Sequence, residues 1–249
     1  MSFLSATNIS HSYANGVQAL REVALGLARG EFVAIVGPTG CGKSTLLRIL
    51  AGLLKPTEGE IHLAGQLLTQ PSAQIGIMFQ NSALLPWRTV LQNVALPLEL
   101  GRAAMHLNQQ RLPQSLLEMV GLQGFEQAHP DELSGGMAQR TALARALVLQ
   151  PPVLLLDEPF AALDAFTREG LTLSLQQIWQ SQQSSIALVT HNIHEAVFLA
   201  DRIVVLSARP GQVTGVVPVT LPRPRAWSME SEPAFGMLVR RVRELLGRI

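Results

Sequence analysis

The chain has 249 residues and one cysteine, Cys41, so an intramolecular disulfide is excluded and a reducing compartment such as the cytosol is expected. Nineteen basic and 18 acidic side chains give a formal net charge of +1, which excludes the strongly basic surface of a nonspecific nucleic-acid binder. Apolar residues make up 47% of the sequence and the mean hydropathy is +0.24, yet no apolar run reaches the roughly 18 residues of a membrane-spanning helix. The N-terminus lacks the pattern of a secretory signal. The apolar excess therefore indicates a large buried core, a surface covered by partners, or both.

The first thirty residues predict an antiparallel hairpin, because two strand-like segments flank an Asn15-Gly16 turn. Thereafter short apolar runs alternate with longer helical patterns, which is typical of an α/β sheet. The predicted strands lie at residues 31–36, 74–79, 153–156, 186–189 and 202–206. Several of them are apolar almost throughout, so we expect a mostly parallel sheet that is covered on both faces.

Residues 81–132 carry no strand signal and predict a small all-helical insertion. Helical spacing covers residues 90–100 and 109–120. Loop breaks are predicted at Gly101, Pro113 and Gly121. After Arg209, proline and glycine precede a last amphipathic helix that begins near Pro233. Its apolar stripe, which we expect to pack on the body of the protein, consists of Phe235, Leu238, Val242, Leu245 and Leu246.

Residues 37–44 (GPTGCGKS) match the phosphate-binding loop pattern, and they lie where that chemistry needs them, after a predicted strand and at the start of a helix. The glycines allow successive backbone N–H groups to face phosphate oxygens, and the helix N-terminus adds a favourable dipole. Lys43 would reach the β- and γ-phosphates of a nucleotide, and Ser44 would bind Mg²⁺. The candidate nucleotide-binding residues are Gly37, Pro38, Thr39, Gly40, Cys41, Gly42, Lys43, Ser44 and Thr45. For the Cys41 side chain two alternatives are open: a reactive thiolate favoured by Lys43 and the helix N-terminus, or an unreactive filler of the loop.

Two adjacent carboxylates, Asp157 and Glu158, follow the apolar run of the third predicted strand. An Asp-Glu-Pro turn after a strand is common in itself, but downstream of a phosphate-binding loop it predicts a catalytic strand. Asp157 would then hold the Mg²⁺ shell, and Glu158 would orient and deprotonate the attacking water.

A second candidate anion site, residues 133–137 (LSGGM), lies between the loop and the carboxylates and starts a predicted helix. Its candidate phosphate-binding residues are Ser134, Gly135 and Gly136. With these three motifs in this order, the chain resembles the ATP-binding cassette family of ATPases, whose signature has the Leu-Ser-Gly-Gly form. The resemblance covers nearly the whole chain, and residues 84–94 (LLPWRTVLQNV) and 207–211 (SARPG) are most similar to ATPases of bacterial importers for nitrate, sulfonates and taurine.

The resemblance implies that ATP and Mg²⁺ are the cofactors, and it implies roles for further residues. Tyr13, the only tyrosine, would stack on adenine, and His191 would contact the γ-phosphate. Gln80 would belong to the catalytic residues and would sense both Mg²⁺ and the helical insertion. Asp164, which ends an Ala-Leu-Asp segment, would lie in the loop that contacts the opposite subunit.

The resemblance also implies the architecture of an α/β phosphate-loop NTPase core with a mostly parallel sheet, an N-terminal antiparallel β layer and a small all-helical insertion. Residues 1–80 and 154–220 would form the nucleotide-binding core, residues 81–153 the insertion with the signature helix, and residues 221–249 a helical tail. Hydrolysis would need a head-to-tail dimer with a second copy or a paralogous ATPase, in which each ATP lies between the loop of one subunit and the signature of the other.

The partners that the resemblance implies are separate integral membrane permease subunits and, indirectly, a periplasmic or lipid-anchored solute-binding protein; no nucleic acid is expected. The implied location is peripheral, at the cytoplasmic face of the inner membrane. A groove for a permease helix would be lined by Leu84, Leu85, Pro86 and Trp87, unless these residues anchor the insertion's own core. The alternative functions are an exporter ATPase, a non-transport ATPase of DNA repair or translation, and a phosphate-loop kinase.

Three positions depart from the family pattern. Met137 stands where the family usually has Gln, Ala161 where Gly or Ser is common, and Asn192 where Asp usually follows the histidine. Since Asn is as good an N-cap as Asp, we expect Asn192 to cap a helix that begins near Ile193.

Overall fold

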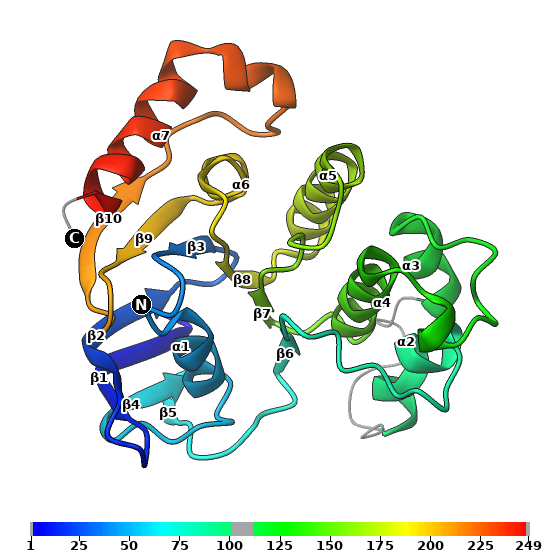
Figure 1. Ribbon diagram of the computed structural model, residues 1–249, viewed down its shortest axis with the longest axis horizontal. Helices are drawn as coiled ribbons and strands as arrows, with labels where there is room; N and C mark the ends of the chain where they lie inside the picture. The colour runs from blue at the N-terminus through cyan, green and yellow to red at the C-terminus, as the bar shows by residue number, and fades with distance from the viewer. Residues whose placement is uncertain (1, 101–111, 248–249) are drawn as a thin grey trace.

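The structure, a computed structural model, describes residues 2–100 and 112–247, and in these ranges it has a four-stranded and a six-stranded β-sheet (Figure 1). The strands are β1 (Leu4–Ser12), β2 (Gln18–Leu27), β3 (Phe32–Val36), β4 (Glu58–Leu63), β5 (Gln66–Leu67), β6 (Ile75–Met78), β7 (Val153–Asp157), β8 (Ser185–Val189), β9 (Arg202–Leu206) and β10 (Val213–Pro218). The smaller sheet is antiparallel in the order β2-β1-β4-β5. The larger sheet has the order β10-β9-β3-β8-β7-β6, in which β10 pairs antiparallel and the other neighbours pair parallel. The predicted mostly parallel sheet and antiparallel β layer are therefore both present.

The sequence pattern located the hairpin and all five predicted strands. β1 and β2 pair antiparallel, with Leu4 opposite Leu27, and the other predictions correspond to β3, β6, β7, β8 and β9 with ends that shift by at most one residue. Three strands were missed. β4 exposes its first three residues, β5 has two residues, and β10 is an edge strand with a mixed pattern of burial. Each therefore lacks the apolar run or clean alternation on which a strand prediction depends.

The helices are α1 (Lys43–Leu50), α2 (Val90–Glu99), α3 (Pro113–Met119), α4 (Gly135–Leu147), α5 (Ala165–Gln182), α6 (Ile193–Leu199) and α7 (Pro233–Leu246), with 3-10 turns η2 (Pro130–Glu132) and η3 (Trp227–Ser231). In Figure 1, α2, α3 and α4 lie together beyond the β6 edge of the larger sheet. Within residues 2–100 and 112–247, none of the helices combines the length and apolarity that a bilayer-spanning segment needs.

One predicted loop break was wrong. Pro113 does not interrupt a helix but is the first residue of α3, because proline at this position loses no intrahelical hydrogen bond and its φ suits the first turn. The break at Gly121 is confirmed, since this residue follows α3 with a φ of 66°. The predicted break at Gly101 and positions 109–111 of the second predicted helix lie outside the described residues.

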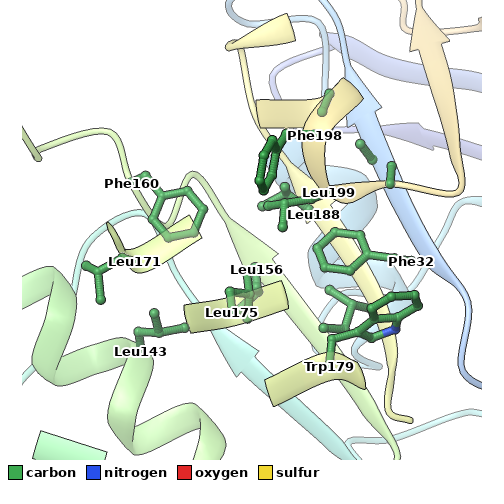
Figure 2. Close-up of a cluster of buried hydrophobic side chains, with 14 of the residues drawn as sticks. Phe32, Leu143, Leu156, Phe160, Leu171, Leu175, Trp179, Leu188, Phe198 and Leu199 are labelled. Atoms are coloured by element: carbon green, nitrogen blue, oxygen red, sulfur yellow. The ribbon is translucent and has the colours of Figure 1, made fainter. Parts of the chain in front are cut away.

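Both faces of the larger sheet are covered, which explains its apolar strands. In β3, Phe32, Ala34 and Val36 face a cluster formed with α4, α5 and α6, whereas Val33 and Ile35 face α1 and the antiparallel sheet. Figure 2 shows the first cluster, where strand side chains meet those of the covering helices. Its labelled members from the other elements include Leu156, Leu188, Leu143, Leu175 and Phe198.

The last helix, α7, packs on α6, β9 and β10, as the amphipathic pattern predicts. Phe235, Val242 and Leu245 of its stripe are buried in the cluster of Figure 2, and Leu238 and Leu246 are partly buried against it. The stripe therefore belongs to the core of the protein.

Candidate active site

Four neighbouring parallel strands bring several of the predicted site residues to one edge of the sheet. β3, β8, β7 and β6 are adjacent, so their carboxyl ends lie side by side, where ligands bind in open α/β sheets. The phosphate-binding loop follows β3, His191 follows β8, Asp157 ends β7 and Gln80 follows β6. Strand order thus assembles motifs that are far apart in the sequence.

The phosphate-binding loop surrounds the ammonium group of Lys43. This side chain is buried, and its Nζ donates hydrogen bonds to the carbonyl oxygens of Gly37 (2.8 Å) and Pro38 (3.0 Å). Gly42 precedes α1 with a φ of 106°, and a Cβ at this position would lie 2.7 Å from the backbone oxygen of Ala19. Only glycine therefore fits at the end of the loop.

The Cys41 side chain is buried inside the same loop. Burial raises the pKa of the thiol, although the charges of Lys43 and Arg209 act in the opposite direction. Reactive cysteines are partly exposed thiolates. Of the two alternatives for Cys41, the structure therefore supports the unreactive filler.

A cavity of about 400 Å³ opens over the loop. Tyr13 lies at this cavity, with its hydroxyl 2.8 Å from Oγ1 of Thr45 and its ring edge-to-face with His11 at a centroid distance of 4.9 Å. These two contacts orient a partly exposed aromatic ring beside the cavity. The predicted site residues that line the cavity are Tyr13, Thr39, Gly40, Gly42, Lys43, Ser44, Thr45, Gln80 and Glu158. Gly37, Pro38 and Cys41 belong to the loop without lining the cavity.

Arg209 is a lining residue that the sequence analysis missed. It follows β9, and its Nε and Nη2 donate to the carbonyl oxygen of Gly40 at 3.1 and 3.0 Å. It adds a second cation to a cavity that already contains Lys43. The only local signal for Arg209 in the sequence is the Arg-Pro-Gly segment that follows a predicted strand. Three uncharged lining residues were also missed, namely Asn15, Val17 and Ala19.

Asp157 has the properties of a ligand for a hard cation. It is only 4% exposed, and within the described residues its Oδ1 atom has no hydrogen-bond partner. Burial raises the pKa of its carboxyl, which the Ser44 hydroxyl lowers and neighbouring Glu158 raises again. A buried carboxylate oxygen without a partner is unfavourable unless a cation binds it. Together with Ser44 and Gln80 at the adjoining cavity, it forms a set of potential oxygen donors that fits Mg²⁺.

Glu158 and His191 contact each other across two strands. The Oε2 atom of Glu158 lies 2.9 Å from Nδ1 of His191, and the Glu158 N–H donates to the carbonyl oxygen of Val189 in β8 (2.9 Å). The Glu158 side chain is mostly buried, whereas the His191 ring is mostly exposed. Glu158 also has left-handed backbone geometry with a φ of 50°, which costs free energy for a residue other than glycine and is typical of functional positions.

The signature residues lie apart from this cavity in the single chain. Ser134 caps α4, with its Oγ accepting a hydrogen bond from the N–H of Met137 at 3.2 Å. Ser134 and Gly135 are exposed, and neither they nor Gly136 line the cavity. Gly136 packs against the next loop, since a Cβ on it would lie 3.1 Å from the carbonyl oxygen of Ala162. The two predicted phosphate sites are therefore separate surfaces of one molecule.

Two further predicted residues are N-caps. Asp164 caps α5 by accepting a hydrogen bond from the N–H of Thr167 (3.0 Å), and this bond lowers the pKa of its carboxyl. Asn192 caps α6 by accepting from the N–H of His194 (2.9 Å), which confirms the predicted cap. Asp164 is exposed and does not line the cavity.

Residues 84–87, which lie before α2, were expected either to line a groove for a permease helix or to anchor the core of the insertion. The structure divides them between buried and exposed positions. Leu84 packs against the cluster of Figure 2, and both backbone groups of Leu85 bond to the buried side chain of Asn93. Pro86 and Trp87 are exposed, Trp87 to 71%. The first half of the segment therefore anchors the insertion, and the second half faces solvent.

Comparison with known proteins identifies relatives that cover most of the chain. Residues 20–161 match the ABC transporter family. An uncharacterized ABC transporter ATP-binding protein of Methanocaldococcus jannaschii is 48% identical over 219 residues, which cover 88% of this chain and 82% of that protein. An aliphatic sulfonates import ATP-binding protein of Bacillus licheniformis is 46% identical over 223 residues, covering 90% and 85% of the two chains. Among solved structures, an ATP-binding cassette in a dimeric post-hydrolysis state with ADP and Pi superposes with a TM-score of 0.78 at 34% identity, covering 88% of this chain and 100% of that one.

Proposed function

Because the chain belongs to the ABC transporter family, we propose that it is the ATP-hydrolysing subunit of an importer for a small solute of the nitrate, sulfonate or taurine class. The observation that carries this proposal is that the phosphate-binding loop and Glu158 line one cavity, with the buried Asp157 beside Ser44 of that loop. The direction of transport and the solute class follow the aliphatic sulfonate importers among the relatives. An exporter ATPase is the alternative.

ATP would bind with its adenine against Tyr13 and its phosphates in the loop. Lys43 would exchange the carbonyl oxygens of Gly37 and Pro38 for phosphate oxygens, since these weak neutral acceptors are its present partners. Mg²⁺ would be held by Asp157, Ser44 and Gln80 and would neutralise charge on the phosphates.

Glu158 is the proposed general base for the attacking water. Its carboxylate lines the cavity, and its backbone is held in a strained conformation that directs the side chain. His191 orients this carboxylate through Nδ1, and its exposed ring can contact the γ-phosphate. The hydrogen bond between them therefore links the proposed general base, Glu158, to the residue that would contact the γ-phosphate, His191.

The proposed site is completed by a second copy of the chain. Ser134, Gly135 and Gly136 form an anion-binding helix N-terminus that lies outside the chain's own cavity and is open to solvent. A head-to-tail dimer would place this surface on the γ-phosphate bound by the other copy. Asp164 would lie in the same interface, since its loop packs against the signature.

The other proposed partners are membrane permease subunits, with a solute-binding protein acting through them. Pro86 and Trp87 are the proposed contact for a permease helix, because an exposed tryptophan on an otherwise anchored segment is suited to a partner. The chain would then work at the cytoplasmic face of the inner membrane.

Glu158→Gln tests this mechanism, because it keeps the shape of the side chain and removes the base. Phosphate release should fall by about 10²- to 10⁴-fold, while ATP binding persists. Light scattering should detect dimers with MgATP and monomers with MgADP. Glu169→Gln, at an exposed position of α5, is the matched control and should hydrolyse ATP like the wild type.

Near-normal hydrolysis by Glu158→Gln would refute the assigned base. Lost hydrolysis without an ATP-dependent dimer, both alone and with the permease, would refute the shared site. Import is tested in vesicles that contain the cognate permease and binding protein. ATP-dependent efflux in place of uptake would assign the chain to the exporter class.

A further inference from the structure

Two cavities lie at the amino ends of the parallel strands. Their volumes are about 420 Å³ and about 390 Å³, and they adjoin, because Arg29, Gly30 and Gln183 line both. Gly30 lies two residues before β3, and Ser185, which lines the larger cavity, is the first residue of β8. The phosphate-binding loop and His191 follow the carboxyl ends of these same strands. The two cavities, called the amino-edge cavities below, are therefore at the opposite edge of the sheet from the nucleotide cavity.

The lining of the amino-edge cavities is rich in hydrogen-bond donors and contains no acid. Two arginines, four glutamines and two serines supply its polar side chains, and among the described residues no aspartate or glutamate joins them. The acids nearby already have partners: Asp201 pairs with Arg223 at 2.8 Å, and Glu31 pairs with Arg202 at 2.6 Å. Of the two lining arginines, Arg29 is therefore the one whose charge no ion pair balances within the part of the chain that the structure describes.

The guanidinium of Arg29 is held by stacking, which leaves its N–H groups available. It lies over the ring of Phe3 at 3.9 Å from the centroid, and it makes no hydrogen bond to another described residue. A stacked guanidinium presents its N–H groups at its edge, in the geometry that matches an oxyanion. The C-terminal ends of α4 and α5 also favour a cation here, since Gln150 follows α4 and Gln182 ends α5. The helix ends explain why a cation lies at this place, whereas its N–H groups still lack an acceptor in the described chain.

Two further donors at these cavities are buried without an acceptor. Nε2 of Gln182 at the larger cavity and Nη1 of Arg223 at the smaller one have no hydrogen-bond partner within the described residues. The other terminal nitrogen of Arg223 is in use, since Nη2 donates to Oδ1 of Asp201 at 2.8 Å. A buried donor without an acceptor is unfavourable, so both positions favour a ligand that supplies acceptor oxygens.

The backbone between the two cavities is fixed before a ligand binds. The N–H of Gly30 donates to Oγ of Ser185 (3.1 Å), and its carbonyl oxygen accepts from Nε1 of Trp179 (3.1 Å). The Trp179 ring packs edge-to-face on Phe32 at a centroid distance of 5.8 Å, and Figure 2 shows both rings in the core cluster. A ligand here would therefore lose little free energy to ordering of the protein.

We propose that the amino-edge cavities bind a small organic monoanion with a sulfonate or carboxylate head group. Arg29 supplies one unbalanced positive charge, which matches a single negative charge better than the double charge of a phosphate. Nη1 of Arg223 and Nε2 of Gln182 supply donors for further oxygen atoms of the ligand. Because no acid lines the cavities, an ammonium group on the ligand would find no partner. The site needs neither ATP nor hydrolysis, so this proposal goes beyond the proposed function and does not depend on it.

Two pairs of probes test the proposal, since the members of each pair differ only by a hydroxyl or an ammonium group. Isethionate is compared with taurine, and glycolate with glycine, in calorimetric titrations of the full-length protein. MgADP is present at saturation, because the phosphate-binding loop also binds oxyanions. We expect isethionate and glycolate to bind, and the two zwitterions to bind at least about tenfold more weakly, because their ammonium group would lie in a lining without an acid.

Variants of two lining residues locate the binding. Arg29→Gln removes the unbalanced charge and should weaken isethionate binding by about tenfold or more, the loss expected for a charge-assisted hydrogen bond. Gln183→Gly removes a side chain that lines both cavities, and the φ of 52° at this position suits glycine, so the variant should fold and bind about fivefold more weakly. Arg21→Gln is the matched control, because Arg21 is an exposed arginine of β2 that lines neither cavity, and it should bind isethionate like the wild type.

Thermal melts without ligand check that each variant folds. The proposal is overturned if the wild type binds neither isethionate nor glycolate. It is also overturned by unchanged affinity in folded Arg29→Gln, or in Gln183→Gly should Arg29→Gln unfold. Zwitterions that bind as tightly as their hydroxyl partners would contradict recognition by a lining without acids. Inorganic sulfate should bind more weakly than isethionate, and equal or tighter binding of sulfate would assign the cavities to an inorganic anion and overturn the organic ligand.

Discussion

The C-terminal tail should stabilise the protein through one buried cation, Arg225. This residue is 3% exposed, and its Nη1 donates to the carbonyl oxygens of Val197 (2.9 Å), Phe198 (3.0 Å) and Ala200 (2.8 Å). These carbonyls lie at the C-terminal end of α6, where helix geometry leaves the last acceptors without intrahelical donors. Arg225→Met keeps the length of the side chain and removes the hydrogen bonds to all three carbonyl oxygens.

The size of the effect follows from two opposing terms. Three buried carbonyls without donors cost about 1–3 kcal/mol each, or roughly 6 kcal/mol together. Burial lowers the pKa of Arg225 to about 10, which means that the charged form is disfavoured in the fold by about 3 kcal/mol, and the variant recovers this amount. The net loss in the free energy of unfolding is about 3 kcal/mol. At about 2–4 °C per kcal/mol for a chain of this size, Tm should fall by about 6–12 °C.

Thermal denaturation followed by circular dichroism measures this shift. Arg241→Met is the matched control, because Arg241 lies on the exposed side of α7 in a surface pair with Glu244, and its Tm should match the wild type. A Tm of Arg225→Met within about 2 °C of the wild type would refute the reasoning. It would mean that water reaches the three carbonyls when the guanidinium is removed.

Four further predictions concern the site and its surroundings. Tyr13→Ala should weaken ATP binding by about 1–3 kcal/mol in a calorimetric titration. Tyr13→Phe keeps the ring and loses the hydrogen bond to Thr45, so it should bind ATP more tightly than the alanine variant. Equal affinity of Tyr13→Ala and wild type would contradict the stacking role. Maleimide should modify Cys41 slowly both with and without MgATP, because the thiol is buried and its pKa is raised, and rapid labelling of the nucleotide-free protein would contradict this. Trp87→Ala should reduce transport by the assembled complex more than it reduces basal ATPase activity, with an unchanged Tm, whereas a lower Tm would indicate a packing role for this exposed ring. Asp157→Asn should weaken Mg²⁺ binding, so that hydrolysis needs a higher Mg²⁺ concentration than in the wild type. It should also raise the Tm of the nucleotide-free protein at neutral pH, since the raised pKa means that the buried charge destabilises the fold; a lower Tm would show that the carboxylate is stabilised in another way.

The motifs that bind phosphate were readable from the sequence because their chemistry is local. The phosphate-binding loop needs glycines and Lys43 within a few residues of one another, and Gly42 has the positive φ that such a loop requires. The N-caps at Ser134, Asp164 and Asn192 likewise depend on N–H groups two or three residues away. Short apolar runs located the five parallel strands of the larger sheet for the same reason, since burial on both faces leaves a continuous local pattern.

The tertiary structure decided whatever depends on distant chain segments. Arg209 lies 169 residues from Gly40, to which it donates, so no local pattern places it at the cavity. Leu84 and Trp87 belong to one apolar segment, but Leu84 packs against the core and Trp87 is exposed. Burial also raises the pKa of the Cys41 thiol, which the sequence alone left open between a reactive thiolate and an unreactive filler. The desolvation of a group depends on all the atoms that surround it in the folded protein. Most of these atoms come from distant residues, so a local sequence pattern does not predict it.

The pair of Glu195 and Asn192 shows both levels in one place. The cap of α6 is local, and an asparagine or an aspartate satisfies it equally. The burial of the Glu195 carboxylate beside this cap is not local, because Arg168 of α5 lies 3.6 Å from it and the sheet and α6 cover it as well. The sequence by itself determined where the helix begins, and the packing of distant elements determined how deeply its first turn is buried.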